Sequence, residues 1–180
     1  MSAHSSHAIS PVDAELQTLA TSSGAYGFYR LRNVAVNVWS APPSPAAVRT
    51  LAELTEQSLI ACPTGICSIH VVEPGMRLPE QEARDGLSLI AKRYEHHLIC
   101  VCVLLRGSGF MVSAQRSALS GIALLSLKRF PLRFFTEAPE LASFAVQQLR
   151  QRLPNEHAPS AGLLTSLLYR CSDDAHVPRA

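Results

Sequence analysis

The sequence predicts an α/β domain built on a mixed, mainly parallel sheet of about five strands with four helices. Three observations lead to this fold class. Two alternating apolar segments, residues 26–32 and 34–39, flank a tight turn at Asn33 and predict a hairpin. Beyond residue 44, helix and strand patterns alternate, as right-handed crossovers between parallel strands require. The uncharged apolar run Leu98–Leu105 indicates a strand that is covered on both faces.

The first half of this pattern contains two helices and one strand after the hairpin. Ser44 and Pro45 are typical of a helix start, a cap residue followed by proline. The β-branched segment 65–72 predicts the next strand. A second helix is expected after Pro79, because acidic residues come early in this segment and basic residues come late. Its predicted buried face consists of Ala83, Leu87, Ile90, Ala91 and Tyr94.

The second half continues the alternation. A third helix is expected to carry Ala114, Ala118, Ile122 and Leu125. Residues 132–136 predict the last strand, and a fourth helix follows up to Leu149. The expected element order is therefore β-β-α-β-α-β-α-β-α.

The two ends of the chain differ from this central part. Residues 1–24 predict a flexible segment, in which Val12, Leu16 and Leu19 have the spacing of a short helix that docks on the domain or frays. The domain itself is expected to cover residues 25–153. Residues 154–180 predict a polar tail with a short helix at the apolar patch 163–169.

Composition excludes several classes of function. The 180 residues are 47% hydrophobic and 17% charged, with a net charge of +2 and dispersed arginines, which argues against a nucleic-acid partner. No run of about 18 uncharged apolar residues is present, so no membrane partner is expected. The start of the chain lacks the pattern of a signal peptide. The five cysteines are interpreted as reduced, mostly buried thiols, which predicts a cytoplasmic protein.

A loop after the central strand is the main candidate site. Its residues are Arg106, Gly107, Ser108, Gly109 and Phe110. The loop leaves the carboxyl end of a strand and enters a helix, where free N–H groups could hold a small anionic ligand and where Ser108 could be phosphorylated. The third glycine of a phosphate loop is missing, so an ordinary turn is the alternative. Arg116, on the following helix, is interpreted either as a partner contact or as a solvated arginine.

Catalytic and metal-binding patterns find no support in the sequence. His96 and His97 are adjacent and diverge on a helix, whereas Cys67 and His70 point to opposite faces of a strand. No catalytic triad has a recognisable context. We therefore expect no enzyme activity, no metal and no cofactor.

Three segments resemble the divergent bacterial domains called STAS-like, which are related to anti-sigma-factor antagonists. They are the Gly-Ser-Gly-Phe turn at 107–110, Arg116-Ser117, and Pro131-Leu-Arg-Phe-Phe135 before a terminal helix. The resemblance covers residues 25–153 and implies a regulatory module with a protein partner, such as a kinase or an anti-sigma-type regulator. One departure is the loop at 73–77, which lacks the hydroxyl residue that a kinase phosphorylates in typical antagonists.

Two functional hypotheses follow. The first is a non-enzymatic interaction module that offers the surface around Met76, residues 106–110 and Arg116 to another protein. The second is a small-ligand-binding domain, or an enzyme without a recognisable signature, with a pocket under the same loops. An interaction surface would be flat with an exposed Met76 or Phe110, whereas a pocket would be concave with convergent polar groups.

Overall fold

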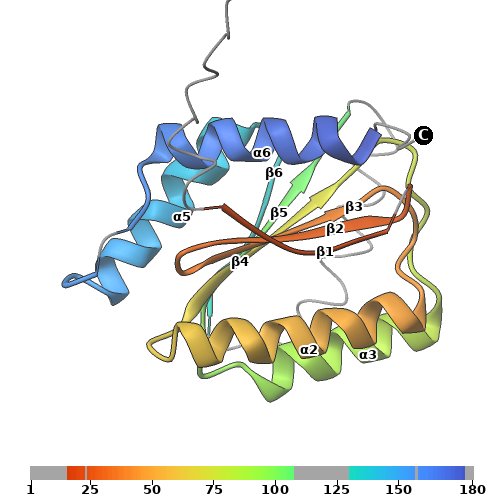
Figure 1. The fold of residues 1–180 in the computed structure, drawn as a ribbon, viewed down its shortest axis with the longest axis horizontal. Helices are drawn as coiled ribbons and strands as arrows, with labels where there is room; N and C mark the ends of the chain where they lie inside the picture. Colours follow the sequence, from red (N-terminus) through yellow and green to blue (C-terminus); the bar gives the residue numbers. More distant parts are fainter. Residues whose placement is uncertain (1–15, 23, 108–129, 157, 177–180) are drawn as a thin grey trace, which may run out of the picture.

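The protein has an α/β fold in which a six-stranded mixed sheet lies between two pairs of helices (Figure 1). The computed structural model describes residues 16–22, 24–107, 130–156 and 158–176, with the backbone alone for 172–176. The predicted fold class is confirmed. The predicted third helix and the loop residues 108–110 lie outside the described residues.

The strands follow one another across the sheet in chain order. They are β1 (Leu16–Ser22), β2 (Tyr26–Leu31), β3 (Val34–Trp39), β4 (Ile66–Val72), β5 (Leu98–Leu105) and β6 (Leu132–Phe135). The first three strands pair antiparallel, and β3 to β6 pair parallel. The predicted hairpin is the β2–β3 pair, and the predicted inner strand is β5, which is buried along its whole length.

Four helices are described, and they cover the two faces of the sheet in pairs (Figure 1). One face carries α2 (Pro45–Ala61) and α3 (Gln81–Arg93), and the other carries α5 (Ala138–Arg152) and α6 (Ala161–His176). Ser44 caps α2 as expected, because its hydroxyl accepts from the backbone N–H of Ala47 at 3.2 Å. None of the described helices is long and apolar enough to cross a membrane.

The turn between α2 and β4 requires its glycine. Gly65 has a φ of +123°, and a Cβ atom there would lie 2.8 Å from the backbone oxygen of His97. Only glycine fits this close approach, which places the start of β4 beside the start of β5.

The expectation of a short helix near Leu16 is wrong, since these residues form β1 at the edge of the sheet. The strand has a bulge between Thr18 and Ala20. Leu16 packs into the core on the α5/α6 side, whereas Leu19 packs on the α2/α3 side. A strand covered on both faces can use apolar residues at odd spacings, and this spacing imitates a helical period.

The C-terminal apolar patch belongs to a packed helix. Leu164, Leu167 and Leu168 of α6 are fully buried and join the same core as α5 and the strands. The helix runs well beyond the predicted patch 163–169. The charged residues of this segment are typical of a polar tail. Its apolar residues nevertheless form a stripe that packs against one face of the sheet.

Candidate functional site

The predicted loop begins where the sheet ends. Arg106 directly follows β5, and Gly107 turns the chain with a φ of +104°. Ser108, Gly109, Phe110 and Arg116 lie outside the described residues. The structure therefore places two of the predicted loop residues and leaves the others as sequence predictions.

Arg106 is engaged with side chains of the protein itself. Its Nη1 atom lies 3.5 Å from Oε1 of Glu73, whose carboxylate is only 5% exposed, and its guanidinium lies 5.7 Å from the ring centre of Tyr169 on α6. That Oε1 atom makes no hydrogen bond, so the ion pair is what compensates its buried charge. An incoming anion would have to compete with Glu73 for Arg106.

Met76 lies in the loop after β4 and is buried, with 7% of its surface exposed. It packs on the α2/α3 side with Trp39 and Val72. Arg106, in contrast, contacts a helix of the opposite layer. The two predicted positions thus take part in different contacts, and Met76 does not offer an exposed apolar surface.

Met76 instead belongs to the wall of a pocket between the sheet and helices α2 and α3. The cavity has a volume of about 190 Å³. This is somewhat more than an apolar cavity of ~150 Å³ that binds benzene. Apolar side chains form most of the wall, among them Trp39, Leu51, Val72, Leu87, Ile90, Tyr94, Val101 and Val103. The pocket explains why Leu87, Ile90 and Ala91 are only half-buried, although the sequence places them on the core face of α3.

A chain of hydrogen bonds forms the polar part of this pocket. Trp39 Nε1 donates to Nδ1 of His70 at 3.2 Å, and Nε2 of His70 lies 3.2 Å from the hydroxyl of Ser68. The amide of Asn37 donates to the same hydroxyl at 3.2 Å. Because β3 and β4 run parallel with Asn37 opposite His70, these side chains meet on one face of the sheet.

The chain of hydrogen bonds and the burial of the ring together determine the tautomer and the charge of His70. A neutral imidazole has one N–H and one acceptor nitrogen, so a ring that accepts at Nδ1 must donate from Nε2. Burial lowers the pKa of His70 from its usual 6.5 to about 4. The ring still has some accessible surface, because it forms part of the pocket wall. His70 is therefore neutral near pH 7, with both nitrogens engaged.

Ser68 is the group that remains free to meet a ligand. Its oxygen accepts two hydrogen bonds, from Asn37 and from His70, which uses both lone pairs. With both lone pairs used, the hydroxyl hydrogen is the part of Ser68 that can pair with an acceptor on a molecule in the pocket. Since neither nitrogen of His70 is free to take a proton from a substrate, this arrangement fits binding better than acid–base catalysis.

Sequence reasoning considered His70 only as a metal ligand with Cys67, and the two side chains do lie on opposite faces of the sheet. It missed the hydrogen-bonded chain. The signal was present as polar residues in two predicted strands, Asn37 in one and Ser68 and His70, two positions apart, in the next.

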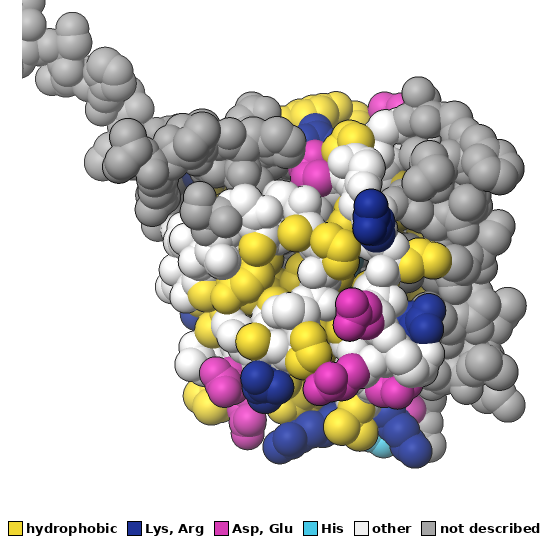
Figure 2. Space-filling view, turned by 90° about the vertical axis from the view of Figure 1, so that its right-hand side faces the viewer, with side chains coloured by type: hydrophobic (Ala, Val, Ile, Leu, Met, Phe, Trp, Pro, Cys, Tyr) yellow, Lys and Arg dark blue, Asp and Glu magenta, His cyan; other side chains and the backbone are white. Residues whose placement is uncertain are grey.

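The end of the sheet toward which the parallel strands point shows a mixed surface. Hydrophobic side chains lie in the middle of this face, and charged side chains of both signs gather mainly along its lower part (Figure 2).

Neither a protein-family model nor a curated protein sequence matches the chain.

Proposed function

We propose that the protein is a non-enzymatic ligand-binding module, and that its ligand is a small, mainly apolar molecule with one hydrogen-bond acceptor. The observation that supports this proposal is the pocket, together with the hydrogen bonds that link Asn37, Ser68, His70 and Trp39 at its wall. Ligand sites combine an apolar lining with a few polar groups that set orientation, and this pocket has both features.

The volume limits the size of the ligand. A cavity of about 190 Å³ accommodates one aromatic ring with a short substituent or a short alkyl chain, and it is too small for a nucleotide. Small side chains at Ser68, Ser88 and Ala91 line this space between α3 and the sheet.

Arg84 adds a preference for negative charge. Its side chain lines the pocket from α3 and is partly exposed, and one of its terminal nitrogens donates to Gln81 at 2.5 Å. The remaining N–H groups are suited to a carboxylate. We therefore propose a small aromatic or alkyl carboxylate as the ligand class.

The regulatory role is the part of the proposal that rests on the sequence alone. The segments that resemble STAS-like domains lie partly at residues 108–117, outside the described residues. In the proposed role, the ligand in the α2/α3 pocket modulates binding of a protein partner.

The experiment uses the full chain and three probes: phenylacetate, its uncharged amide phenylacetamide, and hexanoate. Binding is followed by two-dimensional NMR and thermal unfolding. A ligand that binds only the folded state stabilises it by about 2.7 kcal/mol at a concentration of 100 times Kd. We expect at least one probe to shift resonances of α3 and β4. Failure of all three at millimolar concentration contradicts the proposal.

Two variants on α3 locate the site. Ala91→Phe places a ring in the pocket and should abolish binding, whereas Leu89→Phe changes the exposed side of the same helix and should leave it intact. Equal binding by both folded variants would move the site elsewhere. Arg84→Gln should weaken phenylacetate binding and leave phenylacetamide binding unchanged.

A further inference from the structure

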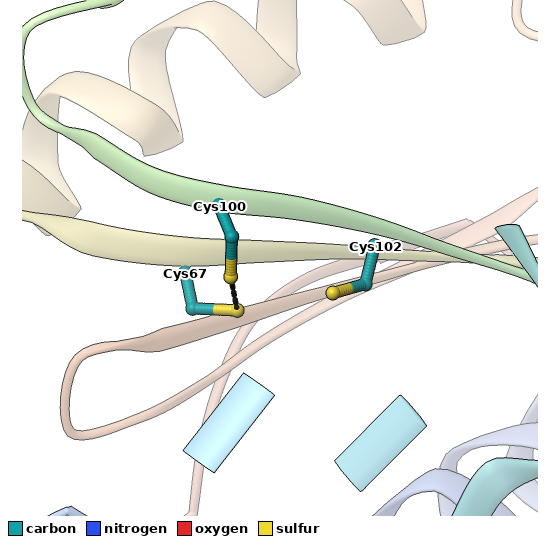
Figure 3. Close-up of side chains that lie close together, drawn as sticks. All are labelled: Cys67, Cys100 and Cys102. Carbon is teal, nitrogen blue, oxygen red and sulfur yellow. Dashed lines mark hydrogen bonds between the residues drawn. The ribbon is translucent and has the colours of Figure 1, made fainter. Parts of the chain in front are cut away.

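Three cysteine sulfurs lie together on the opposite face of the sheet, beneath α5 and α6. Cys67 comes from β4, and Cys100 and Cys102 come from β5 (Figure 3). The sulfurs of Cys67 and Cys100 are 3.1 Å apart, and all three sulfurs lie within 4.8 Å of one another. The sulfur of Cys102 points back toward the other two (Figure 3).

The backbone determines this arrangement. Cys67 and Cys100 are direct partners in the parallel β4–β5 pair, so their side chains leave the sheet side by side. Cys102 lies two residues beyond Cys100, and residues two apart on a strand share a face. Formation of the sheet therefore assembles three sulfur ligands without a flexible loop.

The surroundings are closed and apolar. All three side chains have zero exposed surface and pack in a core of valine, leucine, isoleucine and alanine side chains. Among the described residues, this is the only group of three or more cysteine, histidine or acidic side chains close enough to share a metal ion. A tetrahedral zinc site would need a fourth ligand, and no such ligand belongs to this group.

Three soft ligands without a fourth suit a soft ion of low coordination number. Thiolates favour Cu(I), which accepts two or three sulfur ligands. With metal–sulfur bonds of ~2.3 Å, a trigonal site needs sulfurs about 4 Å apart. The distance between the Cys67 and Cys100 sulfurs, 3.1 Å, would then have to increase by about 0.9 Å. The Cys102 sulfur lies within 4.8 Å of the other two, which is compatible with such a site.

Each thiol of the cluster affects the pKa of its neighbours. Hydrogen bonds with Cys102 and then Cys67 lower the pKa of Cys100, whereas hydrogen bonds with Cys100 and then Cys102 raise the pKa of Cys67. The hydrogen bond to Cys100 also raises the pKa of Cys102, while the charge of Arg133 acts in the opposite direction. Metal binding would release one proton for each sulfur that becomes a thiolate.

We propose that Cys67, Cys100 and Cys102 form a buried binding site for one Cu(I) ion. The site is separate from the α2/α3 pocket, and its occupancy does not depend on the proposed ligand. It ties β4 to β5 at the centre of the α5/α6 core.

The test uses the full chain under anaerobic, reducing conditions. Since α5 and α6 cover the cluster, Cu(I) is supplied both to the folded protein and during refolding, and a colorimetric Cu(I) chelator competes for it. We expect one copper ion per chain and, in X-ray absorption spectra, sulfur ligands only. A wild-type protein that yields all its copper to the chelator, or that retains zinc in preference to copper, overturns the proposal.

Two matched variants assign the ligands. Cys100→Ala removes a sulfur from the cluster, whereas Cys171→Ala makes the same change in the same buried core outside it. We expect Cys100→Ala to lose stoichiometric copper and Cys171→Ala to keep it. Equal retention by both overturns the site. If Cys100→Ala does not fold, the wild-type absorption spectrum decides, because nitrogen or oxygen ligands would contradict a three-sulfur site.

Discussion

The two faces of the sheet are made from alternate residues of the same strands, yet their packing differs. The α5/α6 face is closed, and its strand residues on β3 to β5 are apolar or cysteine. The α2/α3 face includes Asn37, Ser68 and His70 and leaves a cavity of about 190 Å³ beneath α3. One face thus supplies most of the tightly packed core, while the other combines packing with space for a ligand.

The largest effect on stability is expected from removing α6, which covers the closed face of the sheet. Burial of a leucine contributes about 1.5–3 kcal/mol, so Leu164, Leu167 and Leu168 together contribute roughly 4.5–9 kcal/mol. This amount is comparable with the whole stability of a typical domain, about 5–15 kcal/mol. A chain that ends at Glu156 should therefore lose cooperative unfolding, measured by circular dichroism in urea. A truncated chain that unfolds cooperatively with an unchanged midpoint would show that α6 is not part of the core.

The second test concerns pH and the α2/α3 face. The pKa of His70 is about 4 in the folded protein and about 6.5 when unfolded, so the unfolded state binds more protons between these values. Stability should fall as pH decreases from about 6.5 to about 4, by up to about 3 kcal/mol. His70→Gln, which does not titrate, should lose less stability over this range in urea titrations.

The control for this experiment is His97→Gln, at an exposed position in the turn before β5. It should retain the acid sensitivity of the wild type. If His70→Gln and the wild type lose stability in parallel, His70 is not held neutral by burial, and the hydrogen-bond chain in the pocket wall is incorrect.

The smallest effect is expected at the contact between α2 and α3. A Cβ atom at Gly86 would lie 2.8 Å from Cγ1 of Val48, which is itself buried. Overpacking costs about 1–3 kcal/mol, and alanine gains about 1 kcal/mol in helix propensity. Gly86→Ala should therefore lower the free energy of unfolding by about 0–2 kcal/mol. The same change at Gly162 meets no atom within 4 Å and should cause no loss. A clear stabilisation by Gly86→Ala would mean that the two helices can separate freely.

Local patterns predicted much of the fold. The apolar run of β5, the cap at Ser44 and the hairpin turn are each encoded within a few neighbouring residues. β1 was missed because its odd apolar spacing is compatible with a helix. The packing of α6 was missed because it depends on residues far away in the chain.

The candidate site was harder to predict for the same reason. The pocket depends on the distance between α3 and the sheet, and its polar chain depends on the register that places Asn37 opposite His70. That register is a property of two paired strands, so neither strand's sequence indicates it by itself. The predicted position Met76 does line the pocket, whereas Arg106 is held by Glu73, a pairing between the ends of two strands.

The bulge in β1 has a consequence for the behaviour of the protein in concentrated solution. A regular edge strand presents an even row of N–H and C=O groups, onto which a second chain can add in register. Within the described residues β1 is the last strand at this end of the sheet, and the irregularity between Thr18 and Ala20 interrupts its row. The bulge thus discourages sheet-to-sheet growth and the fibrous aggregates to which it leads.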